Sequence, residues 1–405
     1  MNLDYTDEQL ENMTDDELKK LISDCRKYEK VCNVTQQAKK VLINSLYGSL
    51  GHPVGRYYDL RMAESITMGG QLSIKWIARK TNEYFNKLCN TEDVDYVIYC
   101  DTDSQYVCVE NFVKMMADKK GVKIEDVEPI KWVDMLDKFA KNMVEPYIDE
   151  CYRELKDYMN YFDHKLFMDR EVIATRGFWT AKKRYALSVW DNEGKRKLDS
   201  HGNVVPKLKI MGIETRRSST PPFASECLEK AIDIILTENE TNLHAHVDKV
   251  KGEYPKQDYR KIAQVSSANN IEKNSDEFFN HKSGCPGHVK AAINYNKICD
   301  QLKSVSYVDP IRSGEKIQYA MLKVPNKYHI ETIAWPSGDK IPDEFGINPE
   351  KDIDFVGMYC KHFQKPLGNP SFFPSLINFS IASSFLNLNL LYINIFLPSI
   401  LYEQP

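Results

Sequence analysis

The stretch Val94–Val109, VDYVIYCDTDSQYVCV, decides the fold around it. Two runs rich in tyrosine, valine and cysteine, Tyr96–Cys100 and Tyr106–Val109, flank the polar segment Asp101–Gln105. Such runs on either side of a short polar segment predict a β-hairpin. The flanks are nearly continuous in apolar residues, so we expect both faces of the hairpin to contact protein. Its tip then carries two carboxylates, which repel each other and favour a cation.

Asp101 and Asp103 nevertheless have two interpretations. An Asp-x-Asp pair in a turn commonly satisfies local backbone donors and tolerates unusual dihedral angles, with no ligand involved. Alternatively, the pair binds a metal ion, because hard divalent cations prefer carboxylate oxygens. The hairpin by itself leaves both interpretations open.

The composition is that of a globular protein with no overall bias towards nucleic acid. The chain has 405 residues, of which 42% are hydrophobic, and this predicts two or three domains. Its net charge is −4, so any nucleic-acid surface must be a local basic patch. Ten cysteines without a C-x-x-C pair predict reduced thiols in a cytosol-like compartment. The acidic N-terminus lacks the apolar core of a secretory signal.

The first segment, residues 6–48, is predicted to be a helical hairpin. A capping box at Thr14–Glu17 begins its first helix. A break is expected near residues 32–34, followed by a second helix, Thr35–Tyr47.

Lys40, Asn44 and Tyr47 fall at positions i, i+4 and i+7 of that second helix and so share one face. A polar face of this kind is ordinarily just solvated. Gly48 follows directly in the expected C′ position, and its missing side chain would let another molecule approach closely. This combination makes the face a candidate binding surface, with simple solvation as the alternative.

Two further helical stretches are predicted on either side of the hairpin. One runs from about Asp59 to Leu88. The other covers Ile124 to Asn160, where Pro146 should kink or break the helix.

A short strand, Lys165–Ile173, carries Asp169 and Glu171 on the same side, because residues two apart in a strand face one way. These acids are either a second carboxylate pair or an edge neutralised by a neighbouring base. The basic run that follows is predicted to lie inside a strand-like hairpin whose turn is Asp191–Gly194. Basic residues interleaved with aromatic ones suit a surface that grips a phosphate backbone, although exposed charge also serves solubility. The run consists of Lys182, Lys183 and Arg184, and the aromatic Tyr185 follows it.

The C-terminal part changes character twice. A domain boundary is expected near Thr220–Pro222, where a proline begins a helix. Residues 366–402 then contain no charged side chain, and 375–397 is long enough to cross a bilayer. Its asparagine, serine and bracketing proline residues make it a marginal membrane span. The residue types of this stretch are those that AT-rich codons encode, which favours a tail translated from noncoding or frame-shifted sequence.

Four motifs follow one another in the chain, KKVLINSLYG, YCDTDSQYV, MDREVI and AKKRYAL, with RYYDLR after the first and HFQKPL near Leu367. Together they resemble the family B DNA polymerases, most closely those of T-even-type bacteriophages, over residues 1–367. The resemblance implies an α+β fold in which an antiparallel palm sheet with helices lies between a helical fingers segment and a mainly helical thumb. The implied domains are partial fingers at 1–50, the C-terminal part of the palm at 51–221, the thumb at 222–367 and an atypical tail at 368–405.

The resemblance also implies roles for the helix face described above. Lys40 would bind the triphosphate of the incoming dNTP as a catalytic cation. Asn44 would line the same face, and Tyr47 with Gly48 would lie beneath the nascent base pair.

For the palm, the resemblance implies that Asp103 is the catalytic metal ligand and Asp101 its companion. Asp169 and Glu171 match auxiliary metal-site acids, and two Mg2+ ions are the implied cofactor. The implied primer-binding residues are Lys182, Lys183, Arg184 and Tyr185.

The family's first palm motif, its exonuclease acids and its clamp-binding peptide have no counterpart in this sequence. The leading hypothesis is therefore the C-terminal portion of a split or truncated replicative polymerase, which adds dNTPs to a primer 3′ end by two-metal phosphoryl transfer. Its expected partners are primer-template DNA, dNTP and an N-terminal fragment that supplies the first palm aspartate, in a host-cell cytoplasm, without a clamp or a membrane. The alternatives are a non-catalytic duplex-DNA-binding remnant and some other magnesium-dependent phosphoryl transferase.

Overall fold

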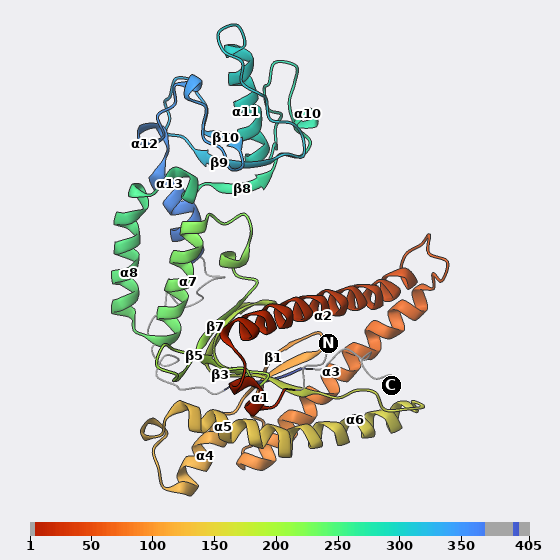
Figure 1. Cartoon of the computed structure of the whole chain (residues 1–405). Helices are drawn as coiled ribbons and strands as arrows, with labels where there is room; N and C mark the ends of the chain where they lie inside the picture. The colour runs from red at the N-terminus through yellow and green to blue at the C-terminus, as the bar shows by residue number, and fades with distance from the viewer. Residues whose placement is uncertain (1–4, 369–391, 397–405) are drawn as a thin grey trace. The chain divides into compact units, whose positions relative to one another are not determined.

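The computed structural model describes residues 5–368 and 392–396 and has the mixed α+β fold that the resemblance implied (Figure 1). The described chain forms two compact units: residues 5–80 with 148–168, and residues 81–147 with 169–368 and 392–396. Among these residues, no helix combines the length and apolar character needed to cross a membrane. Most of the uncharged tail lies outside the described residues. The predicted assignment of fingers, palm and thumb remains a prediction.

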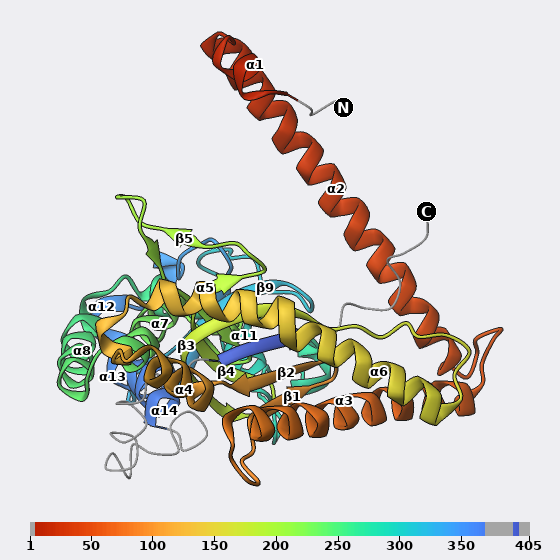
Figure 2. The same cartoon turned by 90° about the horizontal axis from the view of Figure 1, so that it is seen from below.

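The first unit begins with two helices, α1 (Asp7–Glu11) and α2 (Asp15–Leu50). The capping box is confirmed, because the Thr14 hydroxyl accepts from the Glu17 N–H and the Glu17 carboxylate accepts from the Thr14 N–H. The predicted break near residues 32–34 is wrong: α2 is one continuous helix in Figure 2 and ends at Leu50, with Gly51 as its C-cap. Residues 32–34 include no glycine or proline, and the intrinsic helix propensity of each is only about 0.5 kcal/mol less favourable than that of alanine.

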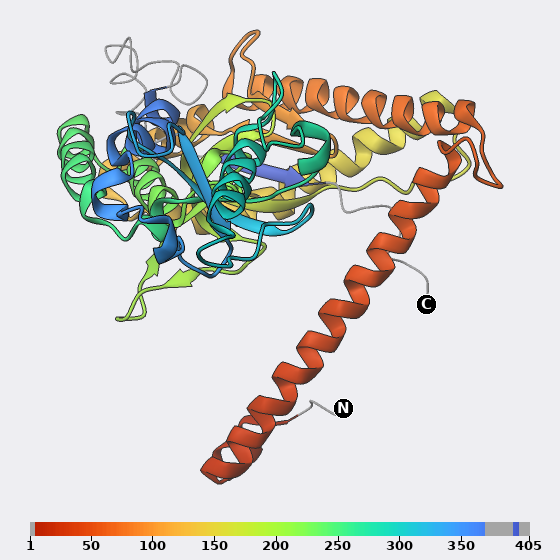
Figure 3. The same cartoon turned by 90° about the horizontal axis from the view of Figure 1, so that it is seen from above.

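Two long helices, each with most of its residues in the first unit, pack together there. They are α3 (Leu60–Cys89), which confirms the predicted Asp59–Leu88 helix, and α6 (Glu145–Met159), side by side in Figure 3. The Trp76 indole N–H donates to the Cys151 carbonyl at 2.9 Å, and its ring stacks on Tyr158 with centroids 5.8 Å apart. Burying large aromatic surface in this way stabilises the helix pair.

The second unit is built on a six-stranded antiparallel sheet in the order β1-β2-β11-β3-β4-β7. The predicted hairpin is confirmed as its first two strands. The predicted 124–160 stretch is mostly helical, and α5 continues through a π turn, Ala140–Val144, into α6, which contains Pro146, without the break that this proline could cause. The bounds are β1 Val97–Asp101, β2 Ser104–Cys108, β3 Asp169–Ala181, β4 Arg184–Asn192, β5 Lys197–Leu198, β6 Val204–Val205, β7 Lys207–Met211, β11 Tyr392–Phe396, α4 Glu110–Lys120, a 3-10 turn Ile124–Asp126 and α5 Pro129–Phe139.

The basic run lies at the turn of a hairpin and not, as predicted, in the arm of a hairpin that turns at Asp191–Gly194; only Arg184 and Tyr185 belong to a strand, β4. Lys182 and Lys183 form the two-residue turn that joins β3 to β4, with Ala181 paired to Arg184. A turn does occur at Glu193-Gly194, but it connects β4 to Lys195. Sequence reasoning missed the lysine turn because it contains none of the usual turn residues; only Lys183 requires a left-handed φ, of 61°.

A buried ion network ties helix α5 to the sheet. The Arg170 guanidinium, whose side chain is 2% exposed, bonds to the carboxylates of Asp137 on α5 and Asp191 on β4. Arg196 adds a second cation, 2.8 Å from Asp191. Buried charges are stable only when paired in this way, so Arg170 fixes the start of β3, where Asp169 and Glu171 lie.

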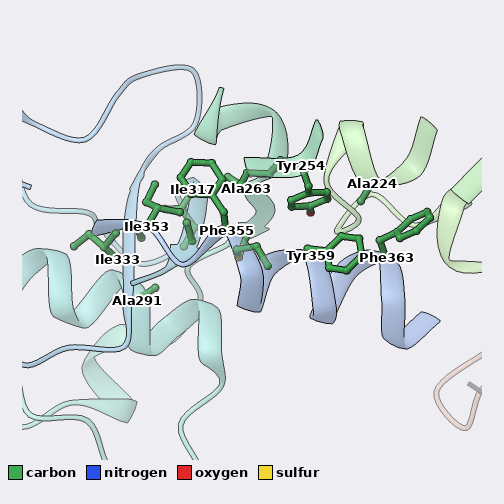
Figure 4. Packing of buried hydrophobic residues seen from close by; sticks show 14 of the residues in the cluster. Ala224, Tyr254, Ala263, Ala291, Ile317, Ile333, Ile353, Phe355, Tyr359 and Phe363 are labelled. Carbon is green, nitrogen blue, oxygen red and sulfur yellow. The ribbon is translucent and has the colours of Figure 1, made fainter. Parts of the chain in front are cut away.

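The remainder of the second unit has one large core, in which Tyr254, Tyr359 and Phe363 are buried (Figure 4). The Tyr359 ring packs against both neighbours, with centroids 5.6 Å from Tyr254 and 5.7 Å from Phe363. A three-stranded antiparallel sheet, β10-β9-β8, lies against α11. The bounds are 3-10 turns Glu214–Arg216, Tyr254–Lys256 and Asp343–Phe345, α7 Pro222–Thr237, α8 Glu240–Glu253, α9 Tyr259–Ile262, β8 Gln264–Ser267, α10 Ile271–Asn274, α11 Gly287–Leu302, β9 Lys316–Met321, β10 Thr332–Pro336, α12 Pro349–Asp352, α13 Phe355–Tyr359, a π turn Cys360–Gln364 and α14 Lys365–Gly368. The predicted helix start after Thr220 is confirmed by α7.

Candidate active site

The tip of the β1–β2 hairpin is a two-residue turn formed by Thr102 and Asp103. Asp101 and Ser104 are the last paired residues before it. Thr102 takes a left-handed φ of 59°, and the Asp103 N–H donates to the Asp101 carbonyl at 2.7 Å. The Thr102 hydroxyl also donates to the Asp101 carboxylate at 3.0 Å. These local bonds hold the two acids at the end of the sheet.

The lysine turn of the β3–β4 hairpin lies against this acidic tip. Lys183 Nζ is 3.7 Å from Asp101 Oδ1, and the Lys183 N–H donates to the Tyr99 hydroxyl at 2.7 Å. The Lys183 side chain is 66% exposed, so the ion pair itself contributes less than about 1 kcal/mol. Its importance is positional, because the structure brings a predicted metal ligand and a predicted primer-binding lysine together.

Four aromatic rings pack between the two hairpins and support both tips. Tyr99, Tyr106, Trp179 and Tyr185 have ring centroids 5.4 to 6.3 Å apart. The Tyr106 hydroxyl donates to the Tyr185 hydroxyl at 3.1 Å. Burial raises the pKa of both phenols, so both remain protonated at neutral pH. Because its ring packs among these aromatic side chains and its hydroxyl bonds to Tyr106, Tyr185 supports the lysine turn from within the protein.

Two other predicted site residues already have charged partners. The Glu171 carboxylate is 2.8 Å from Lys209 Nζ on β7, whereas Asp169 is exposed. The Arg184 guanidinium lies 2.6 Å from both carboxylate oxygens of Glu214. A metal ion at Glu171 or a phosphate at Arg184 would have to share these groups with their present partners.

The residues at this site fit a hard cation in kind but supply only part of a ligand set. Carboxylate oxygens such as those of Asp101 and Asp103 are the ligands that Mg2+ prefers. Within the described part of the chain, however, no three His, Cys, Asp or Glu side chains lie close enough together to hold a metal ion. Asp169 is two strands away, since β11 separates β3 from β2. At least one further carboxylate would be needed.

The predicted nucleotide-binding residues belong to the other compact unit. Lys40, Asn44 and Tyr47 lie on helix α2 with the predicted helical spacing, and all three are exposed. Gly48 lies inside α2, three residues before its C-cap, and not at the C′ position. A Cβ placed on Gly48 would meet nothing within 4 Å. Their assembly with the palm acids remains a prediction.

Sequence reasoning missed the residues that hold the two tips together. Local patterns place Tyr99 only in the hairpin flank and assign no site role to Lys209, Gly212 or Glu214. Only Gly212 gave a local signal, because glycine after a strand often marks a close backbone approach. The partners of Lys209 and Glu214 lie 38 and 30 residues away in the chain, so local patterns could not identify them.

Gly212→Ala is expected to destabilise the site. Gly212 has a φ of 65°, and a Cβ there would lie 1.9 Å from the Lys183 carbonyl oxygen. The backbone strain costs about 1–3 kcal/mol, and the clash displaces the lysine turn. The matched control is Gly194→Ala, which has a φ of 80° but nothing within 4 Å of a Cβ. Equal urea midpoints for the two variants would show that contact with Lys183 is unimportant.

Comparison with known proteins agrees with this geometry. Residues 13–127 match the family model described as DNA polymerase family B. The chain is 41% identical over 367 residues to a DNA-directed DNA polymerase of Enterobacteria phage T4, covering 89% of this chain and 39% of the relative. It is 39% identical over 375 residues to that of Escherichia phage RB69, covering 90% of this chain and 40% of the relative. A DNA polymerase of Pyrococcus glycovorans is 24% identical over 212 residues, which is 51% of this chain and 20% of that protein.

These matches show that the chain belongs to the family B DNA polymerases. Within that family it is of the T4 type. The chain spans about two fifths of the length of its T4 and RB69 relatives, 39% and 40%.

Proposed function

We propose that this chain takes part in template-directed DNA synthesis as one portion of a two-part polymerase. The observation that carries the proposal is the meeting of the two hairpin tips, where Lys183 Nζ lies 3.7 Å from Asp101 Oδ1. Carboxylates for metal ions and an exposed lysine for phosphate are the groups that phosphoryl transfer requires side by side. Family membership supports the same reaction class.

Each group has a definite task in this proposal. Asp103 and Asp101 would hold two Mg2+ ions, aided by Asp169 and Glu171, and these ions would stabilise the attacking and leaving oxygens. Lys40 would neutralise the triphosphate, with Asn44, Tyr47 and Gly48 forming the nucleotide side of the pocket. The primer backbone would contact Lys182 and Lys183, while Arg184 and Tyr185 hold that turn in place.

The missing ligand leads to the two-part arrangement. The described acids do not form a group of three, which supports a first palm aspartate supplied by another polypeptide. We assign it to an N-terminal polymerase fragment, whose other partners would be primer-template DNA and dNTP. The same observation favours the second candidate function, a remnant that binds duplex DNA without chemistry.

Primer extension separates these functions. The probe is the complementing polypeptide, defined as the part of the phage T4 polymerase that this chain does not match, produced as a separate polypeptide. Magnesium-dependent extension should appear only when the chain and the complementing polypeptide are mixed. Duplex binding by the chain without extension by the mixture would contradict the two-part polymerase and support the remnant.

Lys183→Ala is expected to weaken duplex binding and flatten its salt dependence. Losing one phosphate contact should reduce the slope of log K against log salt by about 0.9, with a similar loss for every duplex sequence. The variant keeps the backbone strain at φ 61°, because alanine also has a Cβ. Fluorescence anisotropy at several salt concentrations measures both effects. Lys138→Ala, on the exposed face of α5, is the control and should leave the slope unchanged.

A further inference from the structure

Strand β11 occupies an interior position in the main sheet. Residues Tyr392–Phe396 pair antiparallel with β2 along one edge and with β3 along the other. The strand is the short violet arrow beside β2 in Figure 2. It comes from the uncharged C-terminal stretch, far in sequence from both neighbours, whereas every other pair in this sheet joins strands closer along the chain.

The register of β11 places its end at the candidate metal site. Position 396 lies opposite Ser104 of the acidic tip on one side and opposite Asp169 on the other. Neighbouring strands lie about 4.8 Å apart, so Ser104 and Asp169 are separated by about 10 Å with position 396 between them. A carboxylate at position 396 would therefore lie between the acids of the β1–β2 tip and those at the start of β3. No other position in the sheet has that property.

Strand β11 supplies no carboxylate to the candidate metal site. Residues 366–402, which include all of β11, contain no Asp, Glu, His or Cys. The backbone of β11 also pairs with both β2 and β3, so a second strand cannot pair with either of them at these residues. The acids from the two sides are therefore separated by a segment without a carboxylate side chain.

We propose that β11 is an internal competitor for the strand position that a partner polypeptide must enter to complete the active site. The inference rests on the two-part function proposed above and adds where the partner docks and what opposes it. Removing β11 alone would expose two interior strand edges, which is unfavourable in water. Exchange for a partner strand restores both ladders, so the partner and the tail should compete directly.

Tethering favours the internal strand in this competition. A segment of the same chain acts at an effective concentration of about millimolar, well above that of a free partner. We therefore expect the chain to bind the partner polypeptide at least tenfold more weakly when β11 is held in the sheet than when β11 is free to leave it.

A reversible cross-link tests the proposal in the full-length chain. Tyr392 pairs directly with Cys108 on β2, so Tyr392→Cys places two cysteines opposite each other on antiparallel strands. Such Cα pairs are typically 4.5–5.5 Å apart, within the range that a disulfide spans, about 4.4–6.8 Å. Burial raises the pKa of the Cys108 thiol, so the oxidant should be applied at alkaline pH. Peptide mass mapping then identifies the 108–392 bond among the other cysteines.

The readout is binding of the fluorescently labelled complementing polypeptide before and after reduction. We expect the oxidised Tyr392→Cys chain to bind it at least tenfold more weakly than the reduced chain. The double variant Tyr392→Cys with Cys108→Ser controls for the oxidant and should bind equally in both states. Asn394→Pro, which removes a ladder donor from β11, provides an independent variant and should increase affinity above that of the unchanged chain.

The outcomes separate this inference from the proposed function. Failure of the 108–392 bond to form, or equal binding by the oxidised and reduced chains, overturns the competitor role. Primer extension that proceeds equally in both states overturns it while leaving the polymerase function intact. Absence of binding in both states, and with Asn394→Pro, overturns the inference together with the two-part function.

Discussion

Replacing Asp103 by alanine is expected to lower nucleotide incorporation by the mixture of chain and complementing polypeptide about 10³-fold. The reason is that Asp103 lies at the tip of the β1–β2 hairpin and would bind the proposed metal ions there. Those ions would offset the charge that develops during phosphoryl transfer. Losing several kcal/mol of this stabilisation, about 4, corresponds to that factor. Single-turnover primer extension at saturating Mg2+ measures the chemical step directly.

Unlike nucleotide incorporation, duplex binding should be nearly unchanged in Asp103→Ala. Phosphate contacts by lysine dominate affinity, so the variant should bind duplex within about twofold of the unchanged chain. The matched control is Asp118→Ala, on the exposed face of α4, which should retain full incorporation. If Asp103→Ala incorporates nucleotides at the rate of the control, Asp103 binds no catalytic metal ion. The tip is then an ordinary Asp-x-Asp turn, the alternative that the sequence alone left open.

Arg170→Ala is expected to cost about 3–5 kcal/mol of unfolding free energy in the second unit. The guanidinium is buried between Asp137 and Asp191, and its removal leaves both carboxylates without their shared cation. Urea unfolding followed by intrinsic fluorescence measures the loss. Arg170→Lys should lose less, because the charge remains while the planar fork that reaches two carboxylates is gone.

An exposed arginine supplies the matched control for this prediction. Arg216 lies 3.4 Å from Glu229 with its side chain 52% exposed, so Arg216→Ala should cost less than about 1 kcal/mol. Equal losses for the two arginines would show that the buried network does not hold α5 to the sheet.

Acid provides a second readout of the same network. Burial pushes the pKa of Asp191 upward, but hydrogen bonds from Arg196, the Gly194 N–H and Arg170 outweigh it and hold that pKa below its ordinary 3.8. A carboxylate with a lowered folded pKa contributes stability that is complete above the unfolded pKa and is lost as pH falls through the folded value. The urea midpoint should therefore hold from neutral pH to about 5 and fall below about 4, and by less in Arg170→Ala.

Local patterns predicted several elements because their causes are local. The β1–β2 hairpin follows from two β-prone runs around a polar turn, and the Thr14 cap follows from a hydroxyl and a carboxylate three residues apart. The same reasoning placed a false break in α2 and moved the basic turn by about ten residues. Helix propensities near residues 32–34 are too weak to end a helix, and the lysine turn depends on a distant tyrosine.

The candidate site shows the same division between local and distant causes. The sequence identified Asp101, Asp103 and Lys183 as chemically relevant, but not their contact, because 80 or more residues separate the lysine from the acids. Tyr99 joins the two tips through a bond to a backbone N–H 84 residues away. Gly212 is required only because the chain returns to pass against Lys183.

The sequence by itself determined the family, the hairpin that carries the acids and the absence of any acid from residues 366–402, since each depends on residue identity and local spacing. Only the tertiary structure decided that the acidic and basic tips meet, that Arg170 is buried between two carboxylates, and that β11 lies between β2 and β3. Those relations depend on backbone pairing and packing between segments that are distant in the sequence. Many contacts together determine the free energy of such an arrangement, so no single local sequence pattern can predict it.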